Sequence, residues 1–267
     1  RWEYNLTKNT EKNMLGAIIG DIIGSRFEFD ETPQEGFQLF TVSDDYTDDT
    51  ICTIAIADAI LNNRNYQEAL LDWCHRYPMP KGCYGGMFEK WLLSDNPLPQ
   101  SSYGNGSAMR VSSVGWLFND YHEVLEEAKK SAEVSHCHRE GIKGAQCVAT
   151  LIYWLRTCRI TKDEVENTIK RSFGYDIPSL QDIYKIGDEG HFDSTCMETV
   201  PWAIRCFLES ENFEDAIRIA IMAKGDTDTK AAICGSIAEA YYGIPTSMRE
   251  HALAILPRRI AETLLTF

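Results

Sequence analysis

The sequence lacks a long apolar segment. No stretch of its 267 residues reaches the roughly 18 unbroken apolar residues that a membrane-spanning helix needs. The first residues, RWEYNLTKNTEKN, are polar and lack the apolar core of a signal peptide. We therefore expect a cytoplasmic protein that has no membrane partner.

Basic residues are also scarce. The chain has 26 Lys and Arg against 40 Asp and Glu, which gives a formal net charge of -14. An acidic surface without a Lys/Arg cluster repels a phosphate backbone, so we expect no polymeric nucleic acid as a partner. A small phosphorylated ligand remains compatible with this charge, because helix amino termini and bound cations can hold phosphate.

The cysteines show no pattern of a zinc site or a disulfide framework. There are nine, an odd number, with no C-x-x-C pair among them. Several lie inside apolar runs, as Cys52, Cys147, Cys206 and Cys234 do. We expect buried thiols in a reducing compartment.

Strand-like alternation is almost absent, and helical periodicity dominates the chain. No polar linker or low-complexity segment divides residues 14–267, so we expect one all-α domain there. Apolar residues recur at i, i+3 and i+4 in residues 14–25, 49–63, 66–75, 86–94, 107–119, 122–135, 141–157, 161–173, 195–209, 213–223, 229–242 and 247–254. These segments predict a bundle of about a dozen helices.

The first predicted helix carries a glycine at every fourth position. Gly16, Gly20 and Gly24 lie on one helix face, where a second backbone can pack closely. The G-x-G-x-x-G spacing of a dinucleotide-binding loop is missing. Asp21 lies within this apolar helix, and since an isolated buried charge is costly, we expect it to have a partner.

Two short clusters combine aspartate and threonine just before apolar helices. The first is Thr47-Asp-Asp-Thr50 and the second is Gly225-Asp-Thr-Asp-Thr229. A single cluster would suit an ordinary helix cap. Two clusters favour a shared metal site, because short carboxylates supply the hard oxygen ligands that Mg²⁺, Mn²⁺ or Ca²⁺ prefer.

A rival interpretation arises from the same place. Asp44, Asp45 and Asp48 fit the D-D-x-x-D pattern of all-α prenyl-diphosphate enzymes. Such enzymes need a second aspartate-rich helix face, and the cluster at Asp226 precedes its helix instead of lying along it. Prenyl-diphosphate chemistry is therefore the weaker alternative.

Several motifs together resemble the ADP-ribosylglycohydrolase family. They run in order from Met14 to Gly243: GDIIG (20–24), FEF (27–29), TDDT (47–50), GNGSAMR (104–110), SH (135–136), GDTDT (225–229) and AEAYYG (238–243). The resemblance implies a compact, orthogonal multi-helix bundle, two Mg²⁺ or Mn²⁺ ions, and removal of ADP-ribose from a modified acceptor, commonly arginine. Residues 1–13 lie outside it and are expected to be an N-terminal extension or a cloning remnant.

The resemblance also implies roles for individual residues. The metal ligands would be Thr47, Asp48, Asp49, Asp226, Asp228 and Thr229. Asp48 and Asp228 are candidates for activating water, and Glu28 is a candidate for positioning the ribose or moving a proton. The substrate-binding residues would be Gly104, Asn105, Gly106, Ser107, Met109, Arg110, His136 and Gly225.

For two of these segments the residues alone leave alternatives open. Gly104-Asn-Gly-Ser107 opens a predicted helix, so its free amides could hold a diphosphate; a glycine turn with a serine cap is the other interpretation. The pair His136 and His138 could bind zinc or simply lie in a connecting loop, although no carboxylate stands at zinc spacing. The family resemblance favours contact between His136 and ADP-ribose.

One departure from the family pattern concerns the second cluster. Lys224 stands where the family usually has a second glycine, and we expect its ammonium beside the metals, where it would alter substrate choice. A non-catalytic relative that binds ADP-ribose, or a crystallin-like structural protein, remains an alternative. All six expected metal ligands are present, which argues against such a loss of function.

Overall fold

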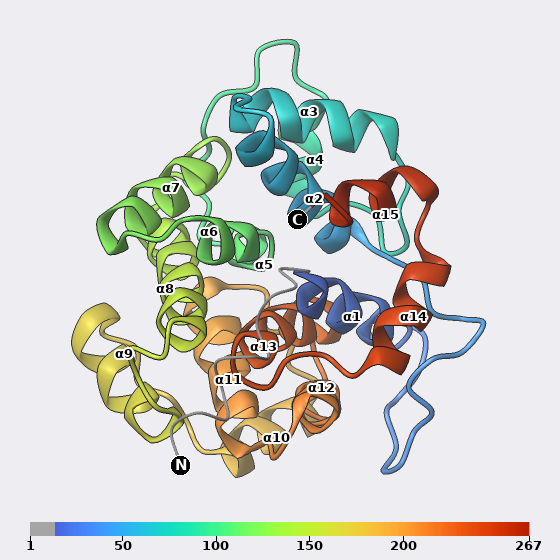
Figure 1. The fold of residues 1–267 in the computed structure, drawn as a ribbon. Helices are drawn as coiled ribbons and strands as arrows, with labels where there is room; N and C mark the ends of the chain where they lie inside the picture. Colours follow the sequence, from blue (N-terminus) through green and yellow to red (C-terminus); the bar gives the residue numbers. More distant parts are fainter. Residues whose placement is uncertain (1–13, 267) are drawn as a thin grey trace.

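The computed structural model of the chain describes residues 14–266, so the expectation for residues 1–13 lies outside the described part. Helices account for its regular structure, and the pairings between extended residues there are isolated bridges, which confirms the all-α class (Figure 1). The helices are α1 (Leu15–Gly24), α2 (Asp48–Leu61), α3 (Tyr66–Arg76), α4 (Gly86–Leu92), α5 (Gly106–Met109), α6 (Ser112–Leu117), α7 (Tyr121–Glu133), α8 (Arg139–Arg156), η1 (Lys162–Glu164, a 3-10 helix), α9 (Val165–Phe173), α10 (Leu180–Asp188), α11 (Cys196–Glu209), α12 (Phe213–Met222), α13 (Thr227–Tyr242), α14 (Thr246–Ile255) and α15 (Arg258–Leu264).

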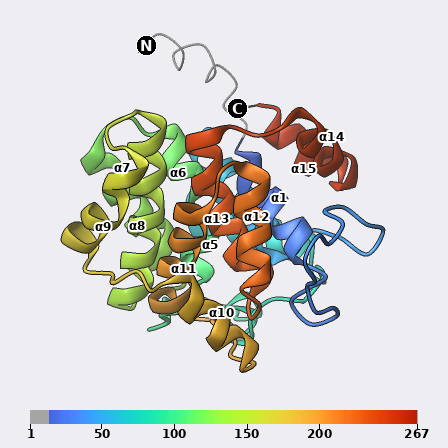
Figure 2. The same ribbon diagram turned by 90° about the horizontal axis from the view of Figure 1, so that it is seen from below.

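Helix α13 lies at the centre of the bundle. It contacts α1, α8, α11 and α12, and Figures 1 and 2 show these helices around it. Its residues from Thr227 to Ala240 are all buried, and so is every residue of α1. Helices that are buried on all faces need small side chains wherever a neighbouring backbone comes close.

The glycine face of α1 meets that need. A Cβ atom at Gly16 would collide with the carbonyl oxygen of Gly235, and one at Gly20 with that of Ala231. At Gly24 a Cβ would lie 2.6 Å from the Cα of Asp228. The prediction of close packing is confirmed. This packing matters for function, because it brings the end of α1 against the second aspartate cluster.

The predicted helix 107–119 is in fact two short helices, α5 and α6. Arg110 and Val111 both have ψ near zero, at -2° and -3°, and the amide of Val114 bonds to Val111, three residues back. The run of i to i+4 hydrogen bonds therefore stops at Arg110. The sequence analysis also missed α10 and α15. They have nine and seven residues and bury just two residues each, so both are shorter than the stretch of about 11–18 residues over which helical periodicity is judged.

Other local predictions agree with the structure. Cys52, Cys147, Cys206 and Cys234 are buried free thiols, as expected, and Thr161 and Glu164 form a capping box at η1 within the predicted segment 161–173. Within residues 14–266, no helix combines the length and the apolar character that crossing a bilayer requires.

Candidate active site

One cleft of about 390 Å³ brings the two aspartate clusters together. Its walls come from the first turns of α2 and α13, from α4 and α5, and from the loops after α1 and before α4, α5, α8 and α11. The predicted residues that line it are Glu28, Asp48, Asp49, Gly104, Asn105, Gly106, Met109, Arg110, His136, Asp226, Asp228 and Thr229. Thr47, Ser107 and Gly225 are not among the residues that line the cleft.

The start of α2 presents Asp48 and Asp49. Thr47 is its N-cap, and its hydroxyl accepts a hydrogen bond of 3.2 Å from the amide of Asp49. The same hydroxyl donates to Oδ1 of Asp21 over 2.7 Å. The side chain of Thr47 is therefore engaged within the protein, while the carboxylates of the first helical turn reach the cleft.

Asp21 fixes this helix start to α1. Its buried carboxylate accepts hydrogen bonds from the amides of Thr47 (3.0 Å) and Thr50 (3.1 Å) and from both of their hydroxyls. Burial raises the pKa of Asp21 to about 6 although these four bonds favour the ionised form. The expected partner of Asp21 is thus the first cluster itself, a role that the sequence did not reveal.

The start of α13 presents Asp226 and Asp228. Asn105 donates a hydrogen bond of 2.7 Å from Nδ2 to Oδ2 of Asp226, and Thr227 bonds to the carbonyl of Gly24 over 3.0 Å. One carboxylate oxygen each from Glu28, Asp226 and Asp228 lies within 4.8 Å of the others. Three acidic side chains therefore converge on one point of the cleft.

These carboxylates repel one another. Burial, with the charge of Asp226, raises the pKa of Glu28 to about 8, and burial, with the charge of Asp21, raises that of Asp48 to about 8. The pKa values of Asp49 and Asp228 are raised well above the usual value, again mainly by burial. A cation placed among these groups would offset the cost of their ionisation.

Two buried carboxylate oxygens would be available to such a cation. Oδ1 of Asp49 and Oδ1 of Asp228 have no hydrogen-bond partner in the described part of the protein, although both are shielded from solvent. Carboxylate and hydroxyl oxygens are ligands that Mg²⁺ and Mn²⁺ prefer. The residues at the cleft therefore fit a divalent metal site.

Asp44 and Asp45 do not join this group. Both carboxylate oxygens of Asp44 accept hydrogen bonds from Nη1 of Arg26, at 2.6 and 2.8 Å, and its side chain is fully buried. Asp45 is exposed and bonds to the amide of Tyr46. The first aspartate of the D-D-x-x-D pattern is thus engaged in an ion pair with Arg26, which argues against prenyl-diphosphate chemistry.

Some residues of the segment at the start of α5 line the cleft, and others bond within the protein. Gly104, Asn105 and Gly106 line the cleft, but the hydroxyl of Ser107 donates to the carbonyl of Gly141 over 2.7 Å and is fully buried. His136 also lines the cleft, whereas His138 caps α8 by accepting from the amide of Glu140. The two histidines therefore do not form a zinc pair.

The expectation for Lys224 is wrong. Its ammonium donates to Oδ1 of Asp188 over 2.6 Å, outside the cleft, and does not lie beside the aspartates. The backbone explains the glycine usual at this position, because Lys224 has a φ of 56°, in the left-handed region. The next residue, Gly225, has a φ of 73° and lies against Asp193 and the carbonyl of His191.

The rim of the cleft contains an aromatic pair for which the sequence predicted no role. Phe29 and Phe192 are exposed, come from two different loops, and stack with ring centroids 5.8 Å apart. Their pairing follows from the tertiary fold and left no periodic signal in the sequence.

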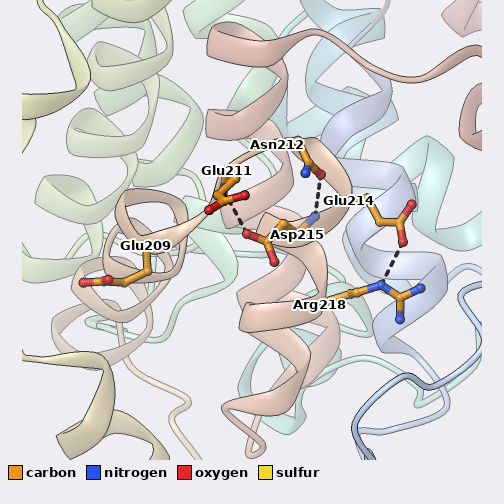
Figure 3. Close-up of a pocket in the computed structure, with 6 residues that line it drawn as sticks. All are labelled: Glu209, Glu211, Asn212, Glu214, Asp215 and Arg218. Carbon is orange, nitrogen blue, oxygen red and sulfur yellow. Dashed lines mark hydrogen bonds and ion pairs between the residues drawn. The ribbon is translucent and has the colours of Figure 1, made fainter.

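A second hollow, of about 500 Å³, shares no residue with the cleft. Figure 3 shows its six residues at the start of α12. Asn212 caps that helix, Asp215 accepts from the amide of Glu211, and Arg218 pairs with Glu214. These are capping and i,i+4 contacts at a helix start, and no residue of either aspartate cluster lies in this hollow.

Comparisons with known proteins show what the chain is similar to. The chain is 25% identical to the ADP-ribosylhydrolase ARH3 of Homo sapiens, over 86% of this chain and 84% of that protein. It is 25% identical to the ADP-ribosylarginine hydrolase Tri1 of Pseudomonas putida, over 86% of this chain and 70% of that protein. A solved structure of an ADP-ribosylglycohydrolase-related protein complex has the same fold, with a TM-score of 0.68, 22% identity, and coverage of 96% of this chain and 97% of that one.

The family comparison covers nearly the whole sequence. The family model described as ADP-ribosylglycohydrolase matches residues 5–265, a span that holds both aspartate clusters and every residue of the cleft. The chain therefore belongs to the ADP-ribosylglycohydrolase family and is a glycosidic-bond hydrolase.

Proposed function

We propose that this protein releases ADP-ribose from a modified acceptor, with ADP-ribosylarginine as the preferred linkage, and that it uses two Mg²⁺ or Mn²⁺ ions. The observation that carries the proposal is the convergence of both aspartate clusters and Glu28 in one cleft, with buried carboxylate oxygens that lack partners. Asp48, Asp49, Asp226, Asp228 and Thr229 would hold the ions. Bound divalent ions supply Lewis-acid polarisation and lower the pKa of water.

The side chains of the cleft have complementary tasks in this reaction. Asp48 and Asp228 line the cleft and, once a bound cation keeps them ionised, would accept a proton from the attacking water. Glu28, which shares the cleft with these aspartates, would position the ribose or move a proton to the departing acceptor. Asn105 holds Asp226 in position from the opposite wall of the cleft.

The rim supports an arginine linkage. Phe29 and Phe192 offer exposed ring faces next to the carboxylate of Glu28. A guanidinium is planar and cationic, so it stacks on aromatic faces and is attracted to carboxylates, whereas a serine acceptor has neither property. The similarity to Tri1, which is named as an ADP-ribosylarginine hydrolase, points the same way.

The test measures free ADP-ribose released from ADP-ribosyl-arginine and ADP-ribosyl-serine peptides, with Mg²⁺ or with EDTA. We expect metal-dependent release from the arginine peptide, lost in Asp48→Ala and kept in Asp45→Ala. Asp45 is a matched control because it is exposed and lies in the same segment outside the cleft. If folded protein binds Mg²⁺ yet releases ADP-ribose from neither peptide, neither linkage is the substrate. That result would favour a non-catalytic binding role.

A further inference from the structure

A buried chain of hydrogen bonds ends at the cleft. Nη2 of Arg110 donates to the carbonyl of Ser131 and to Oγ of Ser135, each over 2.8 Å. Oγ of Ser135 lies 2.8 Å from Nδ1 of His136. Arg110 and Ser135 are buried, at 0% and 1% exposure, and His136 is 7% exposed.

The direction of each hydrogen bond in this chain follows from chemistry. A guanidinium can donate but has no acceptor, so Oγ of Ser135 must accept from Arg110. The single hydroxyl hydrogen of Ser135 is then available for Nδ1 of His136, its one other polar partner among the described residues, and the arrangement that uses this hydrogen makes Nδ1 the acceptor. A neutral imidazole whose Nδ1 accepts carries its hydrogen on Nε2.

We infer that Arg110, acting through Ser135, holds His136 in the neutral tautomer with its hydrogen on Nε2, and that this N–H makes the contact with ADP-ribose that the family resemblance implies. The second half of the inference rests on the proposed function. Arg110 and Ser135 are positioning residues in this arrangement, because they act on the ligand through His136.

The electrostatics keep the ring neutral. Burial and the adjacent charge of Arg110 lower the pKa of His136 to about 3, so the doubly protonated ring is not populated at neutral pH. A neutral ring presents one N–H donor without adding a charge to a cleft that already holds several carboxylates. The chain of hydrogen bonds therefore determines which nitrogen donates.

Nε2 of His136 lies beside two glycines that line the cleft. A Cβ at Gly106 would lie 3.1 Å from Nε2, and one at Gly104 would lie 3.7 Å from it. Both glycines line the cleft and leave the space in front of the imidazole edge open to a ligand. An acceptor-only group suits this place, and the diphosphate is such a group in ADP-ribose.

The first test reads the tautomer in the ligand-free protein. Nitrogen-15 NMR should show a pyrrole-type Nε2 and a pyridine-type Nδ1 for His136, assigned by the signals that disappear in His136→Gln. In Ser135→Ala the two nitrogens should move towards averaged shifts, because Nδ1 loses its donor. A hydrogen on Nδ1 in the wild type, or unchanged shifts in Ser135→Ala, would overturn the inference.

The second test reads binding of free ADP-ribose by calorimetry in the presence of Mg²⁺. Loss of one positioning hydrogen bond in Ser135→Ala should weaken binding about tenfold. Ser131→Ala is the matched control with unchanged affinity, since the Ser131 hydroxyl bonds within its own helix and is equally buried. Equal losses of ADP-ribose affinity in both variants would mean that core packing causes the loss, which would contradict the inference.

Two replacements of the imidazole distinguish its nitrogens. The amide of His136→Gln can place an N–H near the position of Nε2, while that of His136→Asn places it near Nδ1. We expect His136→Gln to bind ADP-ribose at least about tenfold more tightly than His136→Asn, one hydrogen bond being worth that factor. Equal affinities would overturn the contact with ADP-ribose. Failure of the wild type to bind ADP-ribose would contradict the proposed function, whereas the tautomer would still be decided by NMR.

Discussion

The hydroxyl of Thr229 donates a hydrogen bond of 3.1 Å to Oδ2 of Asp49, across 180 positions of the sequence. This bond joins the two aspartate clusters directly, at the starts of α2 and α13. It leaves Oδ1 of Asp49 without a partner in the described structure, together with Oδ1 of Asp228. The fold thus holds more negative charge in one buried place than hydrogen bonds alone can satisfy.

That excess predicts opposite effects of one substitution on stability and on metal binding. Asp228→Asn removes a buried carboxylate from among like charges, so we expect the metal-free protein to gain about 1–2 kcal/mol in free energy of unfolding at pH 8. The same variant should lose the thermal stabilisation that Mg²⁺ gives the wild type. Denaturation with EDTA and with Mg²⁺ measures both effects. A variant that loses stability without metal would contradict the charge-repulsion argument.

Asp21 should act on the metal site from a distance. In Asp21→Asn an amide nitrogen replaces one carboxylate oxygen and faces the donors of Thr47 and Thr50. We expect a loss of about 2–3 kcal/mol in free energy of unfolding, the usual cost of leaving buried polar groups unsatisfied, and weaker Mg²⁺ binding because the start of α2 shifts. Calorimetric titration with Mg²⁺ checks this, with exposed Asp45→Asn as control. Unchanged Mg²⁺ affinity would limit Asp21 to a role in folding.

The sequence predicted the parts of this site that local patterns encode. Glycine spacing predicted the packing of α1, and two copies of one motif predicted that Asp49 and Thr229 would share a site. Other features depend on contacts between distant segments. The stacking of Phe29 on Phe192 and the engagement of Ser107 with Gly141 became visible in the tertiary structure, because neither changes a helical period or a capping signal.

Lys224 shows a second reason why the sequence did not predict every feature of the site. A sequence position beside a metal cluster indicates proximity of the backbone, but a long side chain can extend in a different direction. Here the left-handed backbone turns the chain into Gly225, and the ammonium reaches Asp188. The residue type alone did not indicate that direction.

Substitution of Lys224 should therefore leave catalysis unchanged. Both Lys224→Gly and Lys224→Ala remove the exposed pair with Asp188, so their comparison isolates the backbone. We expect the glycine variant to be more stable than the alanine variant by about 1 kcal/mol, the cost of a left-handed conformation for a residue with a Cβ. Release of ADP-ribose should match the wild type in both. A loss of activity common to both variants would place the ammonium in contact with substrate.

Glu239 predicts a pH dependence that arises at the opposite end of α13 from the aspartate cluster. Its buried carboxylate accepts from the amide of Gly16 over 2.8 Å at the start of α1, and burial raises its pKa from 4.5 to about 7. Between these values the native state binds more protons than the unfolded state. The contribution of Glu239 is therefore fully present below pH 4.5 and is lost as the pH rises through 7.

Comparing the free energy of unfolding of Glu239→Gln with that of the wild type tests the direction of this pH dependence. Relative to the variant, the wild type should lose about 3 kcal/mol of free energy of unfolding between pH 4.5 and 7.5, from 1.36 kcal/mol per pKa unit. Urea denaturation across this range measures the difference, and exposed Glu211→Gln should follow the wild type. A difference that grows in the opposite direction would mean that the Gly16 amide stabilises the ionised carboxylate more than burial destabilises it. The packing of α1 on α13 would then depend on a charged cap, and the metal site at its far end would gain stability as the pH rises.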